Sequence, residues 1–182
     1  VNGELVKAPG TLVVSVYAAC PDVSLTVTPD LKHPGRSVLL FVDLSAGHYR
    51  LGGSALAQTF KQVGNECPDC DTGLLDRGFR ATQRLLRERV LLAGHDRSDG
   101  GLITTVLEMA FGGNCGVSLD LHSEADLMNV LFNEELGLVV EVSEEQMEHV
   151  MGVYKEANVP VEMIGRSVDG DRVSVQFNGE TV

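Results

Sequence analysis

The sequence predicts an α/β domain, with some α+β character, in which helices cover a mixed β-sheet. Apolar runs typical of strands alternate with amphipathic segments typical of helices along the chain. Glycine and proline turn signals separate these runs. The 182 residues are enough to build one hydrophobic core, and no low-complexity tract or interdomain linker divides them. We therefore expect residues 1–182 to form a single domain, with residues 1–10 as a tail or linker from a preceding domain.

Apolar runs rich in β-branched residues predict the strands. The first, residues 11–19, is rich in valine and is typical of a buried strand. The last two flank Asp169 and Gly170, a turn dipeptide that predicts a closing hairpin. The predicted strands are residues 11–19, 37–44, 90–95, 116–121, 137–142, 160–168 and 172–177.

Apolar spacings of three and four residues predict the helices at residues 55–63, 74–89, 101–111, 124–132 and 144–157. Gly52-Gly53-Ser54 opens the first helix and Gly64-Asn65 ends it. Ser123 is expected to cap the fourth, and Ser143-Glu144-Glu145-Gln146 forms a capping box for the fifth. The core-facing residues are expected to be Leu75, Phe79, Thr82, Leu86 and Val90 in the second helix, and Met147, Val150, Met151 and Tyr154 in the fifth.

The charge of the chain limits its partners. A net charge of −12 disfavours nucleic acid and anionic membranes, because both require a basic face. No apolar run approaches the roughly 20 residues of a membrane span, and no signal-peptide pattern opens the chain. The four cysteines lack the context of a small secreted domain, so we expect reduced thiols and a cytoplasmic location.

The most informative motif is His95-Asp96-Arg97-Ser98-Asp99-Gly100-Gly101, which joins a predicted strand to a predicted helix. Such a turn lies where α/β proteins commonly bind ligands. Backbone N–H groups at the helix start favour a phosphate, and Gly100 and Gly101 allow it to approach closely. Ser98 can donate a hydrogen bond to a phosphate oxygen. The Asp96 carboxylate is the ligand type that Mg²⁺ prefers.

A simpler interpretation of this turn has no ligand. Ser98 or Asp99 would cap the helix, Asp96 would be a turn residue and His95 would be packed. The run is neither a P-loop nor a dinucleotide fingerprint, because the lysine-containing ending and the glycine spacing of those motifs are missing.

Several blocks of sequence resemble one enzyme family. They are Thr28-Pro29-Asp30-Leu31, Leu51-Gly52-Gly53-Ser54-Ala55-Leu56-Ala57, the run from His95 to Leu102, Glu108-Met109-Ala110-Phe111-Gly112-Gly113-Asn114-Cys115-Gly116, and Leu131-Phe132-Asn133-Glu134-Glu135-Leu136-Gly137. In this order they resemble the second C-terminal-type domain of the formylglycinamidine ribonucleotide synthases, close to the vertebrate form. The resemblance implies the layered fold of the aminoimidazole ribonucleotide (AIR) synthetase C-terminal domain.

The resemblance also implies a function and its cofactors. Enzymes of this family convert formylglycinamide ribonucleotide, ATP and glutamine into formylglycinamidine ribonucleotide, and a separate glutaminase domain supplies the ammonia. The matching positions imply that Asp96 binds Mg²⁺ and that Ser98 contacts the nucleotide, ATP or ADP. The family carries two copies of this domain pair, one catalytic and one holding an auxiliary nucleotide. The second copy is the one resembled here, and no catalytic residue is assigned.

Two alternatives remain beside this interpretation. The chain could belong to another ATPase of the wider superfamily, such as a selenophosphate synthetase, although the block around Cys115 argues against it. It could also be a structural and interaction module that completes an interface with AIR-synthase-like N-terminal domains and the glutaminase domain. In either case we expect no synthase activity from the chain alone.

Other motifs have structural explanations. Cys67-Pro68-Asp69-Cys70 lacks the second ligand pair that a structural zinc site needs. Cys115 is expected to be a buried thiol. Arg77, Arg80, Arg84 and Arg87 form one row, expected to be a solvated face or a docking surface for an acidic domain. The turn Gly52-Gly53-Ser54 could approach a phosphate or serve packing.

Overall fold

The computed structural model describes residues 12–64 and 66–182, so the expected tail at residues 1–10 lies outside the described residues, as do Thr11 and Asn65. Within the described residues, strands form one mixed sheet in the order β2-β4-β1-β5-β3-β6-β7. Neighbouring strands are antiparallel, except for the parallel pair β3 and β6. The strands are β1 Ser37–Asp43, β2 Ala93–Asp96, β3 Gly116–Leu121, β4 Gly137–Ser143, β5 Val161–Val168, β6 Val173–Phe177 and β7 Glu180–Thr181.

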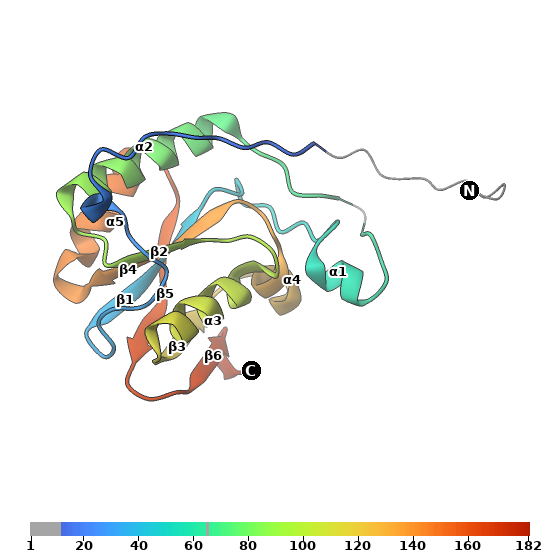
Figure 1. The fold of residues 1–182 in the computed structure, drawn as a ribbon. Helices are drawn as coiled ribbons and strands as arrows, with labels where there is room; N and C mark the ends of the chain where they lie inside the picture. Colours follow the sequence, from blue (N-terminus) through green and yellow to red (C-terminus); the bar gives the residue numbers. More distant parts are fainter. Residues whose placement is uncertain (1–11, 65) are drawn as a thin grey trace, which may run out of the picture.

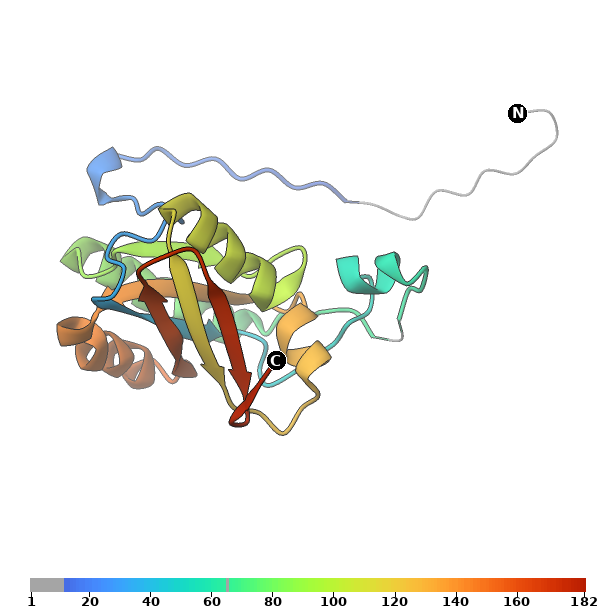
Figure 2. The same cartoon turned by 90° about the horizontal axis from the view of Figure 1, so that it is seen from below.

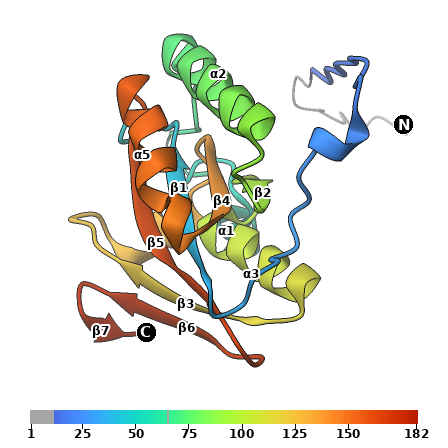
Figure 3. The ribbon, with the colours of Figure 1, turned by 90° about the vertical axis from the view of Figure 1, so that its left-hand side faces the viewer.

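Helices cover both faces of the sheet, which confirms the predicted fold class (Figure 1). Helices α2 and α5 lie side by side on one face, and α3 lies on the other (Figure 3). Helix α4 packs with α3 in the same hydrophobic core. The helical segments are η1 Val23–Leu25, α1 Ala55–Thr59, α2 Thr72–Glu88, α3 Gly101–Gly113, α4 Leu127–Phe132, η2 Glu144–Gln146 and α5 Met147–Glu156. Short α1 buries none of its residues and lies at one end of the molecule, apart from these layers (Figure 2).

Strand β1 lies at the centre of the fold because its side chains enter both cores. Leu39 and Phe41 pack with α3 and α4, whereas Val38, Leu40 and Val42 pack with α2 and α5. Alternate residues of a strand point to opposite faces, so a strand covered on both faces is apolar at every position. The strand predicted at residues 37–44 is therefore confirmed, with its end at Asp43.

The strand predicted at residues 11–19 is wrong over its described part, since residues 12–19 form no strand and are exposed. Leu12, Val16 and Tyr17 are each at least 86% exposed. Valine-rich composition shows that a segment suits a buried strand, but a strand also requires a neighbouring edge. No described strand pairs with these residues, which extend away from the sheet (Figure 2).

The closing hairpin is also wrong, although both of its strands exist. Strand β3 lies between β5 and β6 and pairs with each of them. The Asp169-Gly170 turn therefore spans a third strand instead of joining two direct neighbours. A turn dipeptide defines a local reversal of the chain and does not exclude a strand inserted from elsewhere.

The core-facing side of α2 is shifted by one residue from the prediction. Leu75 and Phe79 are exposed, and the buried residues are Leu74, Gly78, Ala81 and Leu85. A Cβ atom on Gly78 would lie 2.6 Å from Cδ2 of Leu44, so glycine allows α2 to approach the end of β1. Apolar patterning favoured the larger Phe79 over the small residues that this close contact requires.

Helix starts were predicted less well than helix positions. Helix α4 begins at Leu127, and Ser123 instead accepts a hydrogen bond from the amide of Ala125 in the preceding loop. The capping box at Ser143 is also wrong, because residues 144–146 form a 3₁₀ turn and Ser143 makes no side-chain capping bond. In α5, Val150 and Tyr154 are buried as expected, whereas Met147 and Met151 are only partly buried.

The cysteines and the arginine row have simple environments. All four cysteines are free; Cys20, Cys67 and Cys70 are exposed, and Cys115 is buried as predicted. Burial raises the pKa of the Cys115 thiol. In the row, Arg80 pairs with Asp76 and Arg84 pairs with Glu88 on an exposed surface. Across residues 12–64 and 66–182, no helix combines the length and apolar composition that a bilayer crossing requires.

Candidate nucleotide and metal site at the β2–α3 turn

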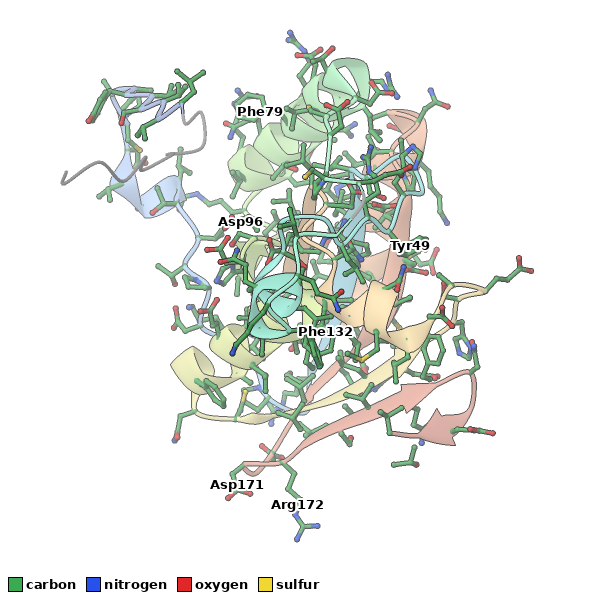
Figure 4. All side chains as sticks on the ribbon, turned by 90° about the vertical axis from the view of Figure 1, so that its right-hand side faces the viewer. Tyr49, Phe79, Asp96, Phe132, Asp171 and Arg172 are labelled. Atoms are coloured by element: carbon green, nitrogen blue, oxygen red, sulfur yellow. The ribbon has the colours of Figure 1, made fainter. Side chains whose placement is uncertain are left out.

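The turn from β2 into α3 exposes the polar side chains that the sequence singled out. Asp96 is the last residue of β2, and its side chain is 69% exposed. Ser98 is exposed two residues further on, so neither side chain enters the core. Figure 4 shows Asp96 at the surface, far from the turn that contains Asp171 and Arg172. A hard oxygen ligand and a hydroxyl donor are therefore accessible on the same turn.

Arg97 anchors this turn because its side chain is directed into the protein. Its Nε donates to the carbonyl of Glu135 at 2.5 Å and its Nη2 to the carbonyl of Leu136 at 3.0 Å. The guanidinium lies 4.8 Å from the ring centroid of Phe41, within the range of a cation–π contact. Burial lowers the pKa of Arg97 to about 10, although Asp43 and Glu135 oppose the shift. With Arg97 held inside, its neighbours Asp96 and Ser98 face solvent.

The two glycines are required by backbone conformation and by packing. Gly100 and Gly101 have φ of +86° and +75°, in the left-handed region that favours glycine. A Cβ atom on Gly101 would lie 2.6 Å from the carbonyl oxygen of Leu131, where α3 meets the end of α4. The amide of Gly101 donates to the carbonyl of Ser98 at 3.0 Å. The glycines thus shape the turn and bring α3 against α4.

Helix α3 has no side-chain cap of its own. Its N-cap is Gly100, and neither Ser98 nor Asp99 makes the capping bond that the simpler interpretation required. Instead, the carboxylate of Glu134 accepts a hydrogen bond from the amide of Gly100 at 2.8 Å. The same oxygen accepts from the amide of Ala55 at 2.8 Å, at the start of α1. The structure therefore brings together two glycine turns that the sequence presented separately.

His95 lies behind Asp96 and connects it to α3. Its Nε2 is 3.1 Å from Glu108 Oε2, and its Nδ1 is 2.7 Å from the carbonyl oxygen of Asp96. The hydroxyl of Thr105 donates to the same carbonyl at 3.1 Å. These contacts hold the end of β2 against α3. Glu108 is therefore part of a local network of polar contacts around His95.

An apolar groove of about 320 Å³ borders Asp96 on the side of α2. Its lining includes Val27, Pro29, Leu86, Leu91, Leu138 and Val140. A groove of this kind can accept the flat, apolar part of a ligand whose charged part reaches the carboxylate.

The side chains of this turn can supply only some of the ligands that a metal site needs. Within residues 12–64 and 66–182, no three His, Cys, Asp or Glu side chains are arranged to hold a metal ion. Mg²⁺ commonly takes one or two protein carboxylates and completes its shell with phosphate and water. Asp96 can supply one such ligand. Cys67 and Cys70 remain free thiols in an exposed loop.

Sequence reasoning identified Asp96, Ser98 and the glycines but missed Arg97, Glu134 and Glu135. Glu135 is fully buried, and Arg50 donates to its carboxylate from Nε at 2.5 Å and from Nη2 at 2.9 Å. Burial alone would raise the pKa of Glu135, but the hydrogen bonds from Arg50 outweigh it and the pKa is lowered. The sequence feature that could have indicated them is the pair of adjacent glutamates, Glu134 and Glu135, in a short apolar segment.

The fold and this turn define the class of protein. The family described as AIR synthase related protein, C-terminal domain, matches residues 34–178, and the chain belongs to that family. A phosphoribosylformylglycinamidine synthase from Homo sapiens is 50% identical over the whole chain. The chain covers 14% of that relative. A relative from Arabidopsis thaliana, described as "Probable phosphoribosylformylglycinamidine synthase, chloroplastic/mitochondrial", is 51% identical over 99% of this chain and is covered over 13% of its length.

Solved structures show the same fold. Thermotoga maritima PurL complexed with ATP superposes with a TM-score of 0.70 at 15% identity, covering 88% of this chain and 26% of that chain. The hydrogenase maturation protein HypE from E. coli superposes with a TM-score of 0.55 at 19% identity, covering 86% of this chain and 51% of that chain. The whole-chain identity to the curated synthases confirms the resemblance drawn from the sequence blocks. The chain spans only 13–14% of those relatives.

Proposed function

We propose that this chain is part of a phosphoribosylformylglycinamidine synthase, an ATP-dependent, glutamine-dependent ligase of purine biosynthesis. Identity of about 50% to curated synthases along the whole chain supports this assignment. In that enzyme, the chain forms one domain. We expect a cytoplasmic location, whereas the Arabidopsis relative is described as chloroplastic/mitochondrial.

The role of the chain in that enzyme is to contribute contacts to Mg²⁺ and to ATP or ADP. Asp96 supplies a carboxylate oxygen to Mg²⁺, and Ser98 donates its hydroxyl to a phosphate oxygen. Gly100 and Gly101 shape the backbone so that the nucleotide can approach the start of α3. The observation that carries this proposal is the exposure of Asp96 and Ser98 on a turn anchored by buried Arg97. The solved relatives complexed with ATP, ADP and AMPPCP are consistent with it.

The partners are the neighbouring domains of the same enzyme, namely AIR-synthase-like N-terminal domains and the glutaminase domain. Residues 12–17 include five large apolar side chains that are each at least 70% exposed. Exposed contiguous apolar surface of this kind marks an interaction site. We expect these residues to be covered by a neighbouring domain. We expect neither nucleic acid nor an anionic membrane as a partner, because the net charge of −12 disfavours binding to both.

The test is the Asp96→Asn variant of the full-length enzyme. Asparagine keeps the size of the side chain and removes the charge that favours Mg²⁺, so we expect nucleotide affinity to fall at least tenfold, equivalent to about 1.4 kcal/mol. Isothermal titration with ATP and Mg²⁺ measures this. The matched control is Asp171→Asn, which removes the same charge from an exposed turn far from Asp96 (Figure 4).

The outcomes separate the two candidate functions. Weaker nucleotide binding in Asp96→Asn, with the control unchanged, supports the nucleotide site. Wild-type nucleotide affinity and retention in both variants would refute it. The chain would then act as an interaction module, a second function favoured by the exposed apolar residues 12–17.

A further inference from the structure

One carboxylate oxygen joins two helix starts that are far apart in sequence. Glu134 Oε1 accepts from the amide of Ala55 and from the amide of Gly100, each at 2.8 Å. Ala55 is the first residue of α1 after the turn Gly52-Gly53-Ser54, and Gly100 is the N-cap of α3. Because α3 has no local side-chain cap, Glu134 supplies the acceptor that its own sequence does not.

The backbone around Glu134 is held on both sides, which gives this carboxylate a defined position. The side-chain amide of Asn133 donates to the carbonyl of Asn129 at 2.6 Å, at the end of α4. On the other side, buried Glu135 accepts two hydrogen bonds from the guanidinium of Arg50. Arg97 then donates to the carbonyls of Glu135 and Leu136. Residues 133–136 are therefore tied to the segment before α1 and to the Asp96 turn.

The turn that Glu134 holds has unusual backbone freedom. Two consecutive glycines, Gly100 and Gly101, adopt positive φ there. Glycine has more accessible backbone conformations than any other residue, so ordering it costs more entropy. If the turn were loose, a nucleotide would have to order it on binding, and its affinity would fall accordingly.

We propose that Glu134 is a positioning residue of the nucleotide site. It holds the turn Gly52-Gly53-Ser54 against the start of α3 and so keeps the Asp96–Gly101 turn ready to bind. This inference rests on the proposed function, because the site it organises is the one assigned to Asp96 and Ser98. Glu134 acts through backbone amides and does not contact the nucleotide.

The opposite role is physically reasonable and makes the inference testable. A carboxylate at the start of a helix occupies the position that a phosphate could take. If Glu134 competes with the nucleotide, its removal must tighten binding. If it positions the turn, its removal must weaken binding. The sign of the change in nucleotide affinity separates the two roles.

The experiment compares Glu134→Ala and Glu134→Gln in the full-length enzyme, by titration with ATP and Mg²⁺. Glutamine keeps an acceptor oxygen, so we expect its Kd within about twofold of wild type, whereas loss of the hydrogen bonds in Glu134→Ala weakens binding about tenfold. Glu148→Ala, an exposed glutamate of α5, is the control and should match wild type.

A second measurement follows the contacts without any activity. Amide hydrogen exchange in the 182-residue chain should show Ala55 and Gly100 protected in wild type and in Glu134→Gln, and exposed in Glu134→Ala. Amide protection in β1 and β4 should be unchanged. That result would distinguish local loosening of the two helix starts from unfolding of the whole chain. Unchanged exchange at both amides in Glu134→Ala overturns the inference.

The remaining outcomes are also decisive. Tighter ATP binding in Glu134→Ala overturns the positioning role in favour of competition. Equal losses in Glu134→Gln and Glu134→Ala overturn it as well, because they assign the effect to charge instead of hydrogen bonding. If Asp96→Asn weakens binding while Glu134→Ala does not, only this inference fails. If neither variant weakens binding, the proposed function itself fails.

Discussion

Two valine-rich segments of this chain have opposite environments. Residues 12–19 are exposed and extend away from the sheet, whereas β1 lies inside the sheet with six consecutive buried residues, from Ser37 to Val42. Strand β1 pairs with β4 on one edge and β5 on the other, and helices cover both of its faces. Similar composition therefore does not produce the same structure. The difference is the presence of neighbouring strands, which a segment cannot supply for itself.

The two segments contribute unequally to the stability of the folded chain. Buried apolar side chains stabilise β1, and each contributes to the free energy of unfolding of this chain. The side chains of residues 12–19 contribute little, because they are as exposed in the folded chain as in the unfolded one. Three measurements test this difference.

The largest effect is expected from truncation of a β1 side chain. Leu40 is fully buried, so Leu40→Ala should lower the free energy of unfolding by about 2–5 kcal/mol through lost burial and the cavity it leaves. Val14→Ala, in the exposed segment, should change it by less than about 0.5 kcal/mol. Urea denaturation followed by circular dichroism measures both. A loss above about 1 kcal/mol in Val14→Ala would show that residues 12–19 pack in solution.

A smaller effect is expected where the chain enters β1. The fully buried carboxylate of Glu141 accepts hydrogen bonds from the amides of Lys32 and His33, at 2.8 and 3.0 Å, and from the hydroxyl of Ser37 at 2.6 Å. Glu141→Ala leaves these donors without their acceptor and should cost about 3 kcal/mol. Native-state hydrogen exchange should show loss of protection at Lys32 and His33.

Glu141→Gln is the matched variant for that experiment. It keeps one acceptor oxygen and the volume of the side chain, so its loss should be about half as large. Equal stability of Glu141→Ala and wild type would mean that this buried carboxylate does not hold the entry to β1.

The smallest effect is a change in acid sensitivity. Residues 12–19 contain no carboxylate, so acid unfolding reports on the sheet and its loops. The pKa of Glu135 is lowered in the folded chain by Arg50. A lowered folded pKa contributes stability above the ordinary value near 4.5, and this contribution is lost as pH falls through the folded pKa. Glu135→Gln should therefore show a shallower loss of stability at acid pH.

The control for acid sensitivity is the exposed pair on α2. Arg80 also lowers the pKa of Asp76, but both side chains are more than half exposed. Exposed ion pairs contribute little to stability, so Asp76→Asn should lose stability at acid pH about as steeply as wild type. Urea midpoints measured from pH 3 to pH 7 compare the two variants. If Glu135→Gln loses stability at acid pH as steeply as wild type, Glu135 is not the cause of that loss.

Local physical chemistry explains which predictions were confirmed. The apolar run of β1, the strand β3, the helix α3 and the exposed Asp96 turn all follow from patterns within about twenty residues. The sequence was less informative about α2, where small residues face the core and large ones face solvent. It also could not identify Arg97 or Glu134 as parts of the site, because their partners lie more than thirty residues away.

The amino-acid sequence was enough to predict the α/β class, the positions of most strands and helices, and the residues of the β2–α3 turn. These properties depend on spacing along the chain, which burial on one or two faces requires. The tertiary structure alone decided that β3 separates β5 from β6, that residues 12–19 have no strand partner among the described residues, and that Glu134 joins two helix starts. Those outcomes depend on which distant segments meet, and a local pattern carries no information about its partner.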